Sequence, residues 1–457
     1  MARGATIRVP EDYRDIQTAV NHALDGDIIL VSSGSYNGFT VSKSVTIIGE
    51  SNETVIIRGA VVVSASGVKL SNFRVVLDEV AGGSVAVLIK GVDVVLTNVV
   101  VESYKYGVQV GSADGRASAV IEYSTVRSDR ETIFGYCSSL SLFYNTLVSE
   151  SGNAVAYCGL MDVEYNKIIS RGTGLTIGGA LSEGNIAKEN EVNVTGDAAG
   201  IFVDGRNHLV ERNKLFNGGI DVRGSQSVIK ANLVVAPGIG VNLVGNGNIV
   251  EGNIISAGGH AIDLYGSGNL ILNNTLSGSR GVHGLNGREN IIAFNFINRT
   301  GNVGVYMSKY TNQNVIYGNT FWLCYNYDAA DESGGNTWYN ETIKMGNYWS
   351  NNKAPDLNGD GITDQPYHIA TTTNLEIVDK YPLARPLISL EQPTTTPTIS
   401  PSTSPTTALT TPSSTSTMPS TTPSSEGGFT NTVVASAIIA LLGVAVTLLL
   451  LLRRSHK

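Results

Sequence analysis

The sequence predicts an all-β protein in which short parallel strands stack coil upon coil into a solenoid. Short apolar segments recur along the chain, and each ends in a similar small polar residue. The gaps between these anchors run from 19 to 26 residues and centre on 21. A fixed period of this length, without helical periodicity between the anchors, is typical of stacked strands. The anchors are Asn72, Asn98, Ser124, Asn145, Asn166, Asn190, Asn213, Asn232, Asn253, Asn274, Asn295 and Asn319.

A second short strand is predicted before each anchor, and it alternates between two faces. Its first and third residues are apolar in most units, its second and fourth are often polar, and its fifth is Gly. We expect the anchor residues to stack into an internal ladder of about thirteen coils, roughly 4.8 Å apart. Five successive units read "IFVDG" from Ile201, "IDVRG" from Ile220, "VNLVG" from Val241, "IDLYG" from Ile262 and "HGLNG" from His283.

The open ends of such a solenoid need covers, and the sequence predicts one at each end. Residues 1–30 form the predicted N-terminal cap, with a helix that Pro10 starts and Gly26 stops. Residues 31–325 hold the repeats. Residues 326–390 form the predicted C-terminal cap, in which Trp338, Tyr348 and Trp349 pack over the last coil. The helical stripe of the N-terminal cap consists of Ile16, Ala19, Val20, Ala23 and Leu24.

The C-terminal region predicts a membrane anchor. Residues 391–431 are rich in Ser, Thr and Pro and predict an extended, O-glycosylated stalk. Residues 432–452 are apolar and long enough to span a bilayer as a helix. The basic tail 453–457, "RRSHK", is then cytoplasmic, which places the bulk of the chain outside the cell. The start, "MARGATIRVPEDY", contains no signal peptide, so we expect that a leader is missing from this sequence or that the true start lies upstream. The alternative is a tail-anchored chain whose bulk is cytoplasmic. Candidate N-glycosylation sites are Asn52, Asn193, Asn273, Asn298 and Asn340.

Two segments resemble a known family. "VPEDYRDIQTAVNHALDGDIILVSSGSYNGFTVSKSVTIIGE" is similar to the opening of pectin-lyase-like right-handed parallel β-helix proteins. The ending, "GNYWS" followed by "DLNGDGITDQPYHI" and "DKYPL", is similar to that of archaeal NosD-type surface proteins. The resemblance covers about residues 5 to 385. It implies a single-stranded, right-handed parallel β-helix, and it implies copper handling in some members.

Composition excludes some functions. The formal net charge is −8, and the chain has no cluster of Lys and Arg, which argues against a nucleic-acid partner. Three cysteines are too few for a disulfide scaffold. Cys137 and Cys158 take the Gly position of two successive units, so they form either a disulfide or two free small residues. The oligomeric state stays open.

A calcium-type loop is predicted near the C-terminus. Asp356, Asn358, Asp360 and Asp364 stand at loop positions 1, 3, 5 and 9, and the carbonyl of Ile362 is at position 7. The glutamate usual at position 12 is absent. We expect a weakly held structural Ca²⁺ that fixes the C-terminal cap, and the alternative is an ordinary Asx-rich turn.

Copper is not favoured by the supply of ligands. Copper binds clusters of His, Cys or Met, and none of the six histidines forms a close pair in the sequence. His260 and His283 are about one coil apart, but they stand at different strand positions.

The outward face of the solenoid is the candidate site for chemistry. In "IDVRG", Asp221 and Arg223 point outward, and Asp204, Asn242 and Asp263 lie on neighbouring coils. Asp221 and Asp263 are expected roughly 9–10 Å apart, near the upper separation of an inverting carboxylate pair. Candidate catalytic residues are therefore Asp204, Asp221, Arg223 and Asp263. The alternative is a solvated face with an incidental ion pair.

Aromatic residues form two predicted columns. Outward aromatic rings are candidate platforms for sugars. A second column, Tyr123, Tyr144 and Tyr165, precedes three successive anchors, and we expect it to be a stack in the core. The outward candidates are Phe134, Tyr136, Tyr157, Phe202 and Tyr265.

The sequence therefore favours a membrane-anchored surface protein that presents a long face to polysaccharide or glycoprotein. The first alternative is a lyase, hydrolase or epimerase of acidic polysaccharide. The second is periplasmic copper handling of the NosD type. An enzymatic role is not decided by the sequence, because a fold does not imply a function.

Overall fold

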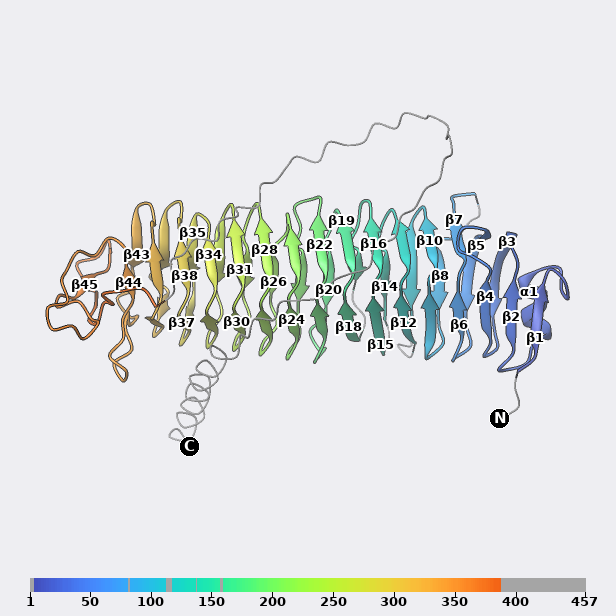
Figure 1. The fold of residues 1–457 in the computed structure, drawn as a ribbon, viewed down its shortest axis with the longest axis horizontal. Helices are drawn as coiled ribbons and strands as arrows, with labels where there is room; N and C mark the ends of the chain where they lie inside the picture. The colour runs from blue at the N-terminus through green and yellow to red at the C-terminus, as the bar shows by residue number, and fades with distance from the viewer. Residues whose placement is uncertain (1–3, 81–82, 112–116, 137, 157–158, 388–457) are drawn as a thin grey trace, which may run out of the picture. The chain divides into compact units, whose positions relative to one another are not determined.

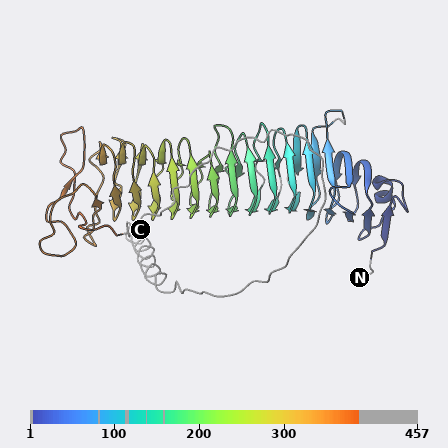
Figure 2. The same cartoon turned by 45° about the horizontal axis from the view of Figure 1, so that its top comes forward.

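A computed structural model describes residues 4–80, 83–111, 117–136, 138–156 and 159–387, which form the predicted solenoid (Figure 1). Each regular coil adds one strand to a first sheet and two strands to a second (Figure 2). The strands within each of these sheets are paired in parallel. The architecture confirms the predicted fold class.

The first sheet has fifteen strands, whereas the sequence predicted about thirteen coils. The anchors begin only at Asn72, directly after the fourth strand of this sheet, so the first three strands belong to coils without an anchor. In order the strands are β1 (Thr6–Val9), β2 (Ile28–Val31), β4 (Thr46–Gly49), β6 (Lys69–Ser71), β9 (Val94–Thr97), β12 (Ser118–Glu122), β15 (Ser139–Phe143), β18 (Leu160–Glu164), β21 (Ile186–Lys188), β24 (Leu209–Glu211), β27 (Val228–Lys230), β30 (Ile249–Glu251), β33 (Leu270–Leu272), β37 (Ile291–Ala293) and β41 (Val315–Tyr317).

The second sheet contains the strands on both sides of a bend. Strands β3 (Gly34–Val41) and β5 (Val55–Val63) run through both rows. The row that follows the anchors is β7 (Arg74–Leu77), β10 (Val100–Ser103), β13 (Thr125–Ser128), β16 (Thr146–Ser149), β19 (Lys167–Ser170), β22 (Glu191–Val194), β25 (Lys214–Phe216), β28 (Leu233–Ala236), β31 (Ile254–Ala257), β34 (Thr275–Ser277), β38 (Phe296–Asn298), β42 (Thr320–Trp322) and β44 (Tyr348–Trp349). The next row is β8 (Val85–Ile89), β11 (Tyr106–Val110), β14 (Ile133–Gly135), β17 (Val155–Ala156), β20 (Leu175–Ile177), β23 (Ile201–Val203), β26 (Ile220–Val222), β29 (Val241–Leu243), β32 (His260–Leu264), β35 (Arg280–Gly284), β39 (Val303–Met307) and β43 (Tyr327–Asp331).

The alternation of the strands builds the core. In β23, β26 and β29 the first and third residues are buried, and the middle residue points outward. Burial of these aliphatic side chains is the main favourable term in such a fold. Two short pairs complete the strands, namely β36 (Gly287–Arg288) with β40 (Thr311–Asn312) and β45 (Tyr367–His368) with β46 (Val378–Asp379).

The anchor residues form the predicted internal ladder. The backbone N–H of Asn253 donates to Oδ1 of Asn274 at 2.9 Å, and Nδ2 of Asn253 donates to the same oxygen at 3.0 Å. The same pattern repeats on each coil from Asn145 to Asn319. Asn72 and Asn98 lie outside the buried ladder, which corrects the prediction for these two anchors. They have positive φ angles of 62° and 54°, and the next residues, Phe73 and Val99, are buried instead.

A second ladder runs along another corner, and the sequence interpretation missed it. Asn248 donates through its backbone N–H to Asn269, and Asn269 donates in the same way to Asn290. His208 belongs to this ladder, because its Nδ1 accepts the backbone N–H of Asn185 at 3.0 Å. Both ladders satisfy buried backbone donors that the bends of the coils leave outside the sheets.

The column Tyr123, Tyr144 and Tyr165 lies on the surface, so the predicted core stack is wrong. The rings stack at centroid distances of 5.1 and 4.9 Å, but the side chains are 58%, 50% and 42% exposed. All three residues have φ angles between 49° and 57°. This left-handed turn reverses the alternation of the strand, so the side chain before each ladder residue points outward.

Because the tyrosine stack is exposed, Tyr144→Gly is expected to change the free energy of unfolding by less than about 1 kcal/mol. Loss of ring stacking costs about as much as glycine gains at a positive φ. Gly252 and Gly318 already occupy equivalent positions, with φ angles of 63° and 65°. Urea denaturation tests this. A loss of 3 kcal/mol or more, the range for deleting a buried aromatic, would restore the core interpretation.

The two ends of the solenoid hold the segments predicted as caps. Helix α1 (Ile16–His22) starts at Asp15 rather than Pro10, and the side chain of Asp15 accepts the backbone N–H of Thr18 at 2.7 Å. Ile16, Ala19 and Val20 are buried, but Leu24 lies beyond the helix and is 71% exposed, contrary to the prediction. At the other end, Trp349 stacks on the last coil through Phe321, at a centroid distance of 4.3 Å.

In the part of the chain that the structure describes, no helix is both long and apolar enough to cross a membrane. The predicted stalk (391–431), membrane span (432–452) and tail (453–457) lie outside the described residues.

Candidate functional site on the outer face

One outward-facing row of side chains carries most of the candidate chemistry, and we call it the outer column. Consecutive members are register partners on adjacent strands, so each lies beside the next along the solenoid. At about 4.8 Å per coil, five steps cover about 24 Å. The members are Phe202, Asp221, Asn242, Asp263, His283 and Tyr306.

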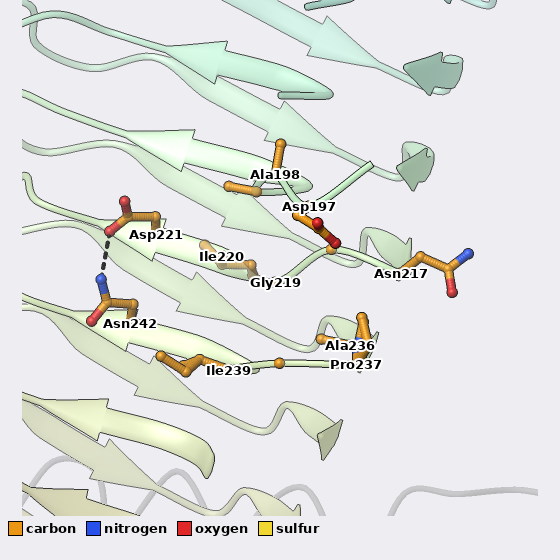
Figure 3. Close-up of a pocket in the computed structure, with 13 residues that line it drawn as sticks. Asp197, Ala198, Asn217, Gly219, Ile220, Asp221, Ala236, Pro237, Ile239 and Asn242 are labelled. Carbon is orange, nitrogen blue, oxygen red and sulfur yellow. Dashed lines mark hydrogen bonds between the residues drawn. The ribbon is translucent and has the colours of Figure 1, made fainter. Parts of the chain in front are cut away.

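The first half of the outer column is polar and adjoins a pocket. Asn242 donates to Oδ1 of Asp221 at 3.0 Å, and Arg223 pairs with Oδ2 of Asp221 at 3.1 Å. The guanidinium of Arg223 lies 5.2 Å from the ring centre of Phe202. Asp221 and Asn242 also border a pocket of about 330 Å³, together with turn residues that include Asp197 and Ile239 (Figure 3).

The structure separates the four candidate catalytic residues. Asp221 and Arg223 form an ion pair, and Asp263 lies two coils further along the outer column. Asp204 lies in a turn after Phe202, where its carboxylate accepts the backbone N–H of Gly205. Two coils at about 4.8 Å each keep Asp221 and Asp263 near the expected separation, and a catalytic role of the four residues stays a prediction.

The second half of the outer column contains a cluster that the sequence interpretation missed. Oδ1 of Asp263 lies 2.7 Å from Nδ1 of His260 and 3.1 Å from Nδ1 of His283, and the two Nδ1 atoms are 2.9 Å apart. Nη1 of Arg280 lies 3.0 Å from Nε2 of His260, and its guanidinium lies 4.9 Å from the ring centre of Tyr306. We call His260, Asp263, Arg280, His283 and Tyr306 the histidine cluster.

The sequence interpretation placed His260 and His283 about one coil apart at different strand positions, and it missed that their rings meet. The two residues do occupy different strand positions, since His260 pairs with Arg280 and His283 pairs with Asp263. However, His260 is the first residue of β32, and its ring turns toward Asp263 three residues later. The ring centres of His260 and His283 are consequently 4.1 Å apart. Only side-chain direction, which the spacing does not give, brings them together.

Burial and hydrogen bonding set the charges in the histidine cluster. Burial tends to raise the pKa of Asp263, but hydrogen bonds from His283 and His260 outweigh it and lower the pKa. Burial lowers the pKa of His260. Because Arg280 has only donors, its contact with Nε2 of His260 places the proton of a neutral His260 on Nδ1, facing Asp263.

Arg280 itself is incompletely satisfied. Its Nε is buried and has no hydrogen-bond partner, and no ion pair with a carboxylate is found for it among the described residues. A cationic group in this state favours an anionic or polar ligand, because an unpaired buried donor is costly.

Only one of the predicted aromatic platforms that the structure describes lies in the outer column. Phe202 belongs to the outer column. Phe134 lies on an earlier coil of the same face, 5.1 Å from the ring of Tyr106. Tyr136 and Tyr265 are 57% and 42% exposed, and Tyr157 lies outside the described residues.

The predicted calcium loop has the geometry of a hydrogen-bonded turn. Asp356 accepts the backbone N–H groups of Gly359 and Gly361 at 2.8 and 2.9 Å. Asp360 accepts from Ile362, and Asp364 accepts from Leu357, both at 2.9 Å. Calcium at Asp356, Asn358, Asp360, Ile362 and Asp364 stays a prediction.

Of the three cysteines, the structure describes only Cys324. Cys137 and Cys158 lie outside the described residues, so their pairing stays a prediction. Cys324 is a half-buried free thiol, and burial raises its pKa to about 12, which keeps it protonated and unreactive at neutral pH. Of the glycosylation candidates, Asn273 is exposed, and Asn52, Asn193, Asn298 and Asn340 are half-buried.

Fold and site together define a parallel β-solenoid with a polar and aromatic outer face. Residues 166–354, which include the whole outer column, match the family model described as "Periplasmic copper-binding protein (NosD)". This match bears out the NosD-type resemblance over that segment. No curated protein matches the sequence of the chain.

Solved structures of similar fold are distant in sequence. The A-module of the mannuronan C-5 epimerase AlgE6 from Azotobacter vinelandii is 12% identical, with 71% of this chain and 93% of that chain covered and a TM-score of 0.41. The catalytic unit of a GH87 α-1,3-glucanase from Streptomyces thermodiastaticus is 13% identical, with 72% and 71% covered and a TM-score of 0.48. The PL6 lyase Pedsa3628 from Pseudopedobacter saltans is 15% identical, with 69% and 84% covered and a TM-score of 0.41.

Proposed function

We propose that the outer column binds a polysaccharide. The observation that carries this proposal is a pair of arginine–aromatic contacts on one face, with Arg223 over Phe202 and Arg280 over Tyr306. An aromatic ring gives a sugar an apolar platform, and the adjacent guanidinium donates hydrogen bonds to hydroxyls or a carboxylate.

The spacing of the two contacts fits an extended ligand. Phe202 and Tyr306 stand at the two ends of the outer column, about 24 Å apart at about 4.8 Å per coil. Between them, Asp221 and Asn242 offer acceptors and donors to sugar hydroxyls. The pocket beside Asp221 and Asn242 provides room for a substituent or branch of the bound chain.

Substitution of the two aromatic residues tests the proposal. Phe202→Ala and Tyr306→Ala should each weaken polysaccharide binding about tenfold, the effect of losing roughly 1.4 kcal/mol of ring contact. The measurement is retention on a panel of acidic and neutral polysaccharides, followed by calorimetry on the tightest ligand.

The matched control is Tyr310→Ala. Tyr310 is 63% exposed, and Lys309 lies 5.0 Å from its ring centre, so it is an equivalent cation–aromatic pair off the outer column. Unchanged binding is expected for this variant. Absence of binding to every polysaccharide, or equal effects of all three substitutions, would refute the proposal.

Processing of a bound acidic polysaccharide is the second candidate function, and the contacts of Asp263 favour it. The carboxylate of Asp263 contacts two histidines, at 2.7 Å from Nδ1 of His260 and 3.1 Å from Nδ1 of His283. A histidine oriented by a carboxylate is a common general base. Mass spectrometry of the polysaccharides recovered from the binding assay decides between the two functions, and recovery of intact ligand alone rejects processing.

Surface display belongs to the same proposal. The apolar segment 432–452 and the stalk 391–431 support a chain anchored in the membrane with residues 4–387 outside. Digestion of intact cells with an external protease should release the solenoid. A solenoid that stays protected until the cells are lysed argues against display.

A further inference from the structure

The histidine cluster holds three potential metal ligands at contact distance. Nδ1 of His260, Oδ1 of Asp263 and Nδ1 of His283 form a triangle with sides of 2.7, 2.9 and 3.1 Å. In the described part of the chain, no other set of three or more His, Cys, Asp or Glu side chains brings its ligand atoms within 4.8 Å of one another. The calcium-type loop does not achieve this with Asp356, Asp360 and Asp364.

We propose that His260, Asp263 and His283 together bind one divalent transition-metal ion on a single face of a six-coordinate shell. With bonds of about 2.1 Å, neighbouring ligands of a six-coordinate ion lie about 3.0 Å apart, and those of a tetrahedral ion about 3.4 Å apart. The observed sides match the six-coordinate value. Two histidines and one carboxylate on one face leave three positions open for water or for ligand oxygens.

The donor set selects the class of metal. Calcium and magnesium prefer all-oxygen sites, whereas two imidazoles and a carboxylate suit divalent ions such as iron, cobalt, nickel, copper or zinc. Thiolate or thioether ligands, which favour Cu(I), are absent from these three residues. The inference goes beyond polysaccharide binding and does not depend on it.

The fold positions the ligands before any ion binds. Asp263 and His283 are register partners on β32 and β35, so the ladder between these strands fixes their separation. Asp263 is 4% exposed, and its neighbours hold its carboxylate in place. Such preorganisation lowers the entropic cost of binding, because fewer side chains must be ordered.

Arg280 opposes the ion in a way that can be measured. When a metal binds Nδ1 of His260, the ring keeps its proton on Nε2, and that atom can no longer accept from Arg280. The single ring proton of a neutral His260 therefore moves from Nδ1 to Nε2 without net release to solvent, and Arg280 must leave His260 while it keeps its contact with Tyr306. The positive charge of Arg280 also repels the ion.

The test is Zn²⁺ titration calorimetry on the full chain after treatment with a chelator. His260→Gln, Asp263→Asn and His283→Gln should each weaken binding by at least about tenfold. Arg280→Met should instead tighten binding several-fold, because it removes both the competing hydrogen bond and the repulsion. His368→Gln, which changes an exposed histidine on β45, is the matched control and should have no effect.

A second measurement does not depend on variants. Co²⁺ added to the wild-type protein should give the weak visible absorption of a six-coordinate ion rather than the intense bands of a tetrahedral one. Zn²⁺ binding that is unchanged in all three ligand variants, or weakened by Arg280→Met, would overturn the inference. Polysaccharide retention by the chelated wild type is measured separately, so the failure of either proposal is distinguishable from that of the other.

Discussion

Replacement of Asn253 by alanine is expected to lower the free energy of unfolding by about 4 kcal/mol. It removes a buried side chain that makes several hydrogen bonds in the main ladder, which is the ladder of the anchor residues. Nδ2 of Asn253 donates to the carbonyls of Ile229 and Glu251 at 2.8 and 3.1 Å. Its Oδ1 accepts the backbone N–H and the Nδ2 of Asn232, both at 2.9 Å. Alanine leaves these groups unpaired at a site that is 1% exposed.

Two further variants calibrate this result. Asn253→Ser should have an intermediate effect, since Ser124 already occupies the ladder and accepts the backbone N–H of Val99 at 3.1 Å. Asn273→Gly changes an exposed residue on the adjacent coil at a φ of 55°, and it should cost less than about 0.5 kcal/mol. Denaturation and hydrogen exchange in β27, β30 and β33 provide the readout. Equal stability of the Asn253→Ala and Asn273→Gly variants would show that the ladder contributes little.

The second large effect concerns pH and the C-terminal end. Asp379 terminates the main ladder, because its Oδ2 accepts the backbone N–H of Asn347 at 2.7 Å and the indole N–H of Trp349 at 3.0 Å. Burial raises the pKa of Asp379 to about 6, and it raises the pKa of Asp328 to about 6 as well. In the unfolded chain both carboxyls have ordinary pKa values near 3.8.

These directions fix the sign of the pH dependence. The folded state binds the protons of Asp328 and Asp379 more tightly than the unfolded state does. Their contribution to the free energy of unfolding is therefore complete below about pH 4, and it is lost as the pH rises through about 6. For each carboxyl, the difference between a pKa of about 6 in the folded state and one near 3.8 in the unfolded state corresponds to about 3 kcal/mol. The wild-type C-terminal end should therefore open more readily at pH 7.5 than at pH 4.5.

Asp379→Asn should remove roughly half of this dependence, whereas Asp129→Asn, an exposed control, should leave it unchanged. Hydrogen exchange at β44 and β46, compared at the two pH values after correction for intrinsic exchange rates, measures the effect. Opening of the C-terminal end that is equally frequent at both pH values in the wild type would contradict the raised pKa values of Asp328 and Asp379.

The sequence alone determined the repeat, the strands and the main ladder. These follow from local chemistry, since a strand alternates every second residue and an amide at a fixed interval can bond to its own copy on the next coil. The sequence also placed Phe202, Asp221, Asn242 and Asp263 on one outward face, because the register of the coils follows from the spacing of the anchors.

Only the tertiary structure decided which way side chains turn where the alternation breaks. The residue before each position of the main ladder has a positive φ angle, and for this reason the side chains of Tyr123, Tyr144 and Tyr165 lie on the surface. A residue with a positive φ angle also precedes the second ladder, as at Gly247 before Asn248. The histidine cluster has the same origin. His260 and His283 occupy different strand positions, and their rings meet only because the first residue of β32 lies at a bend where its side chain can reach across to Asp263. Spacing along the chain fixes the coil on which a residue lies, but the backbone angles at each bend fix the direction of its side chain.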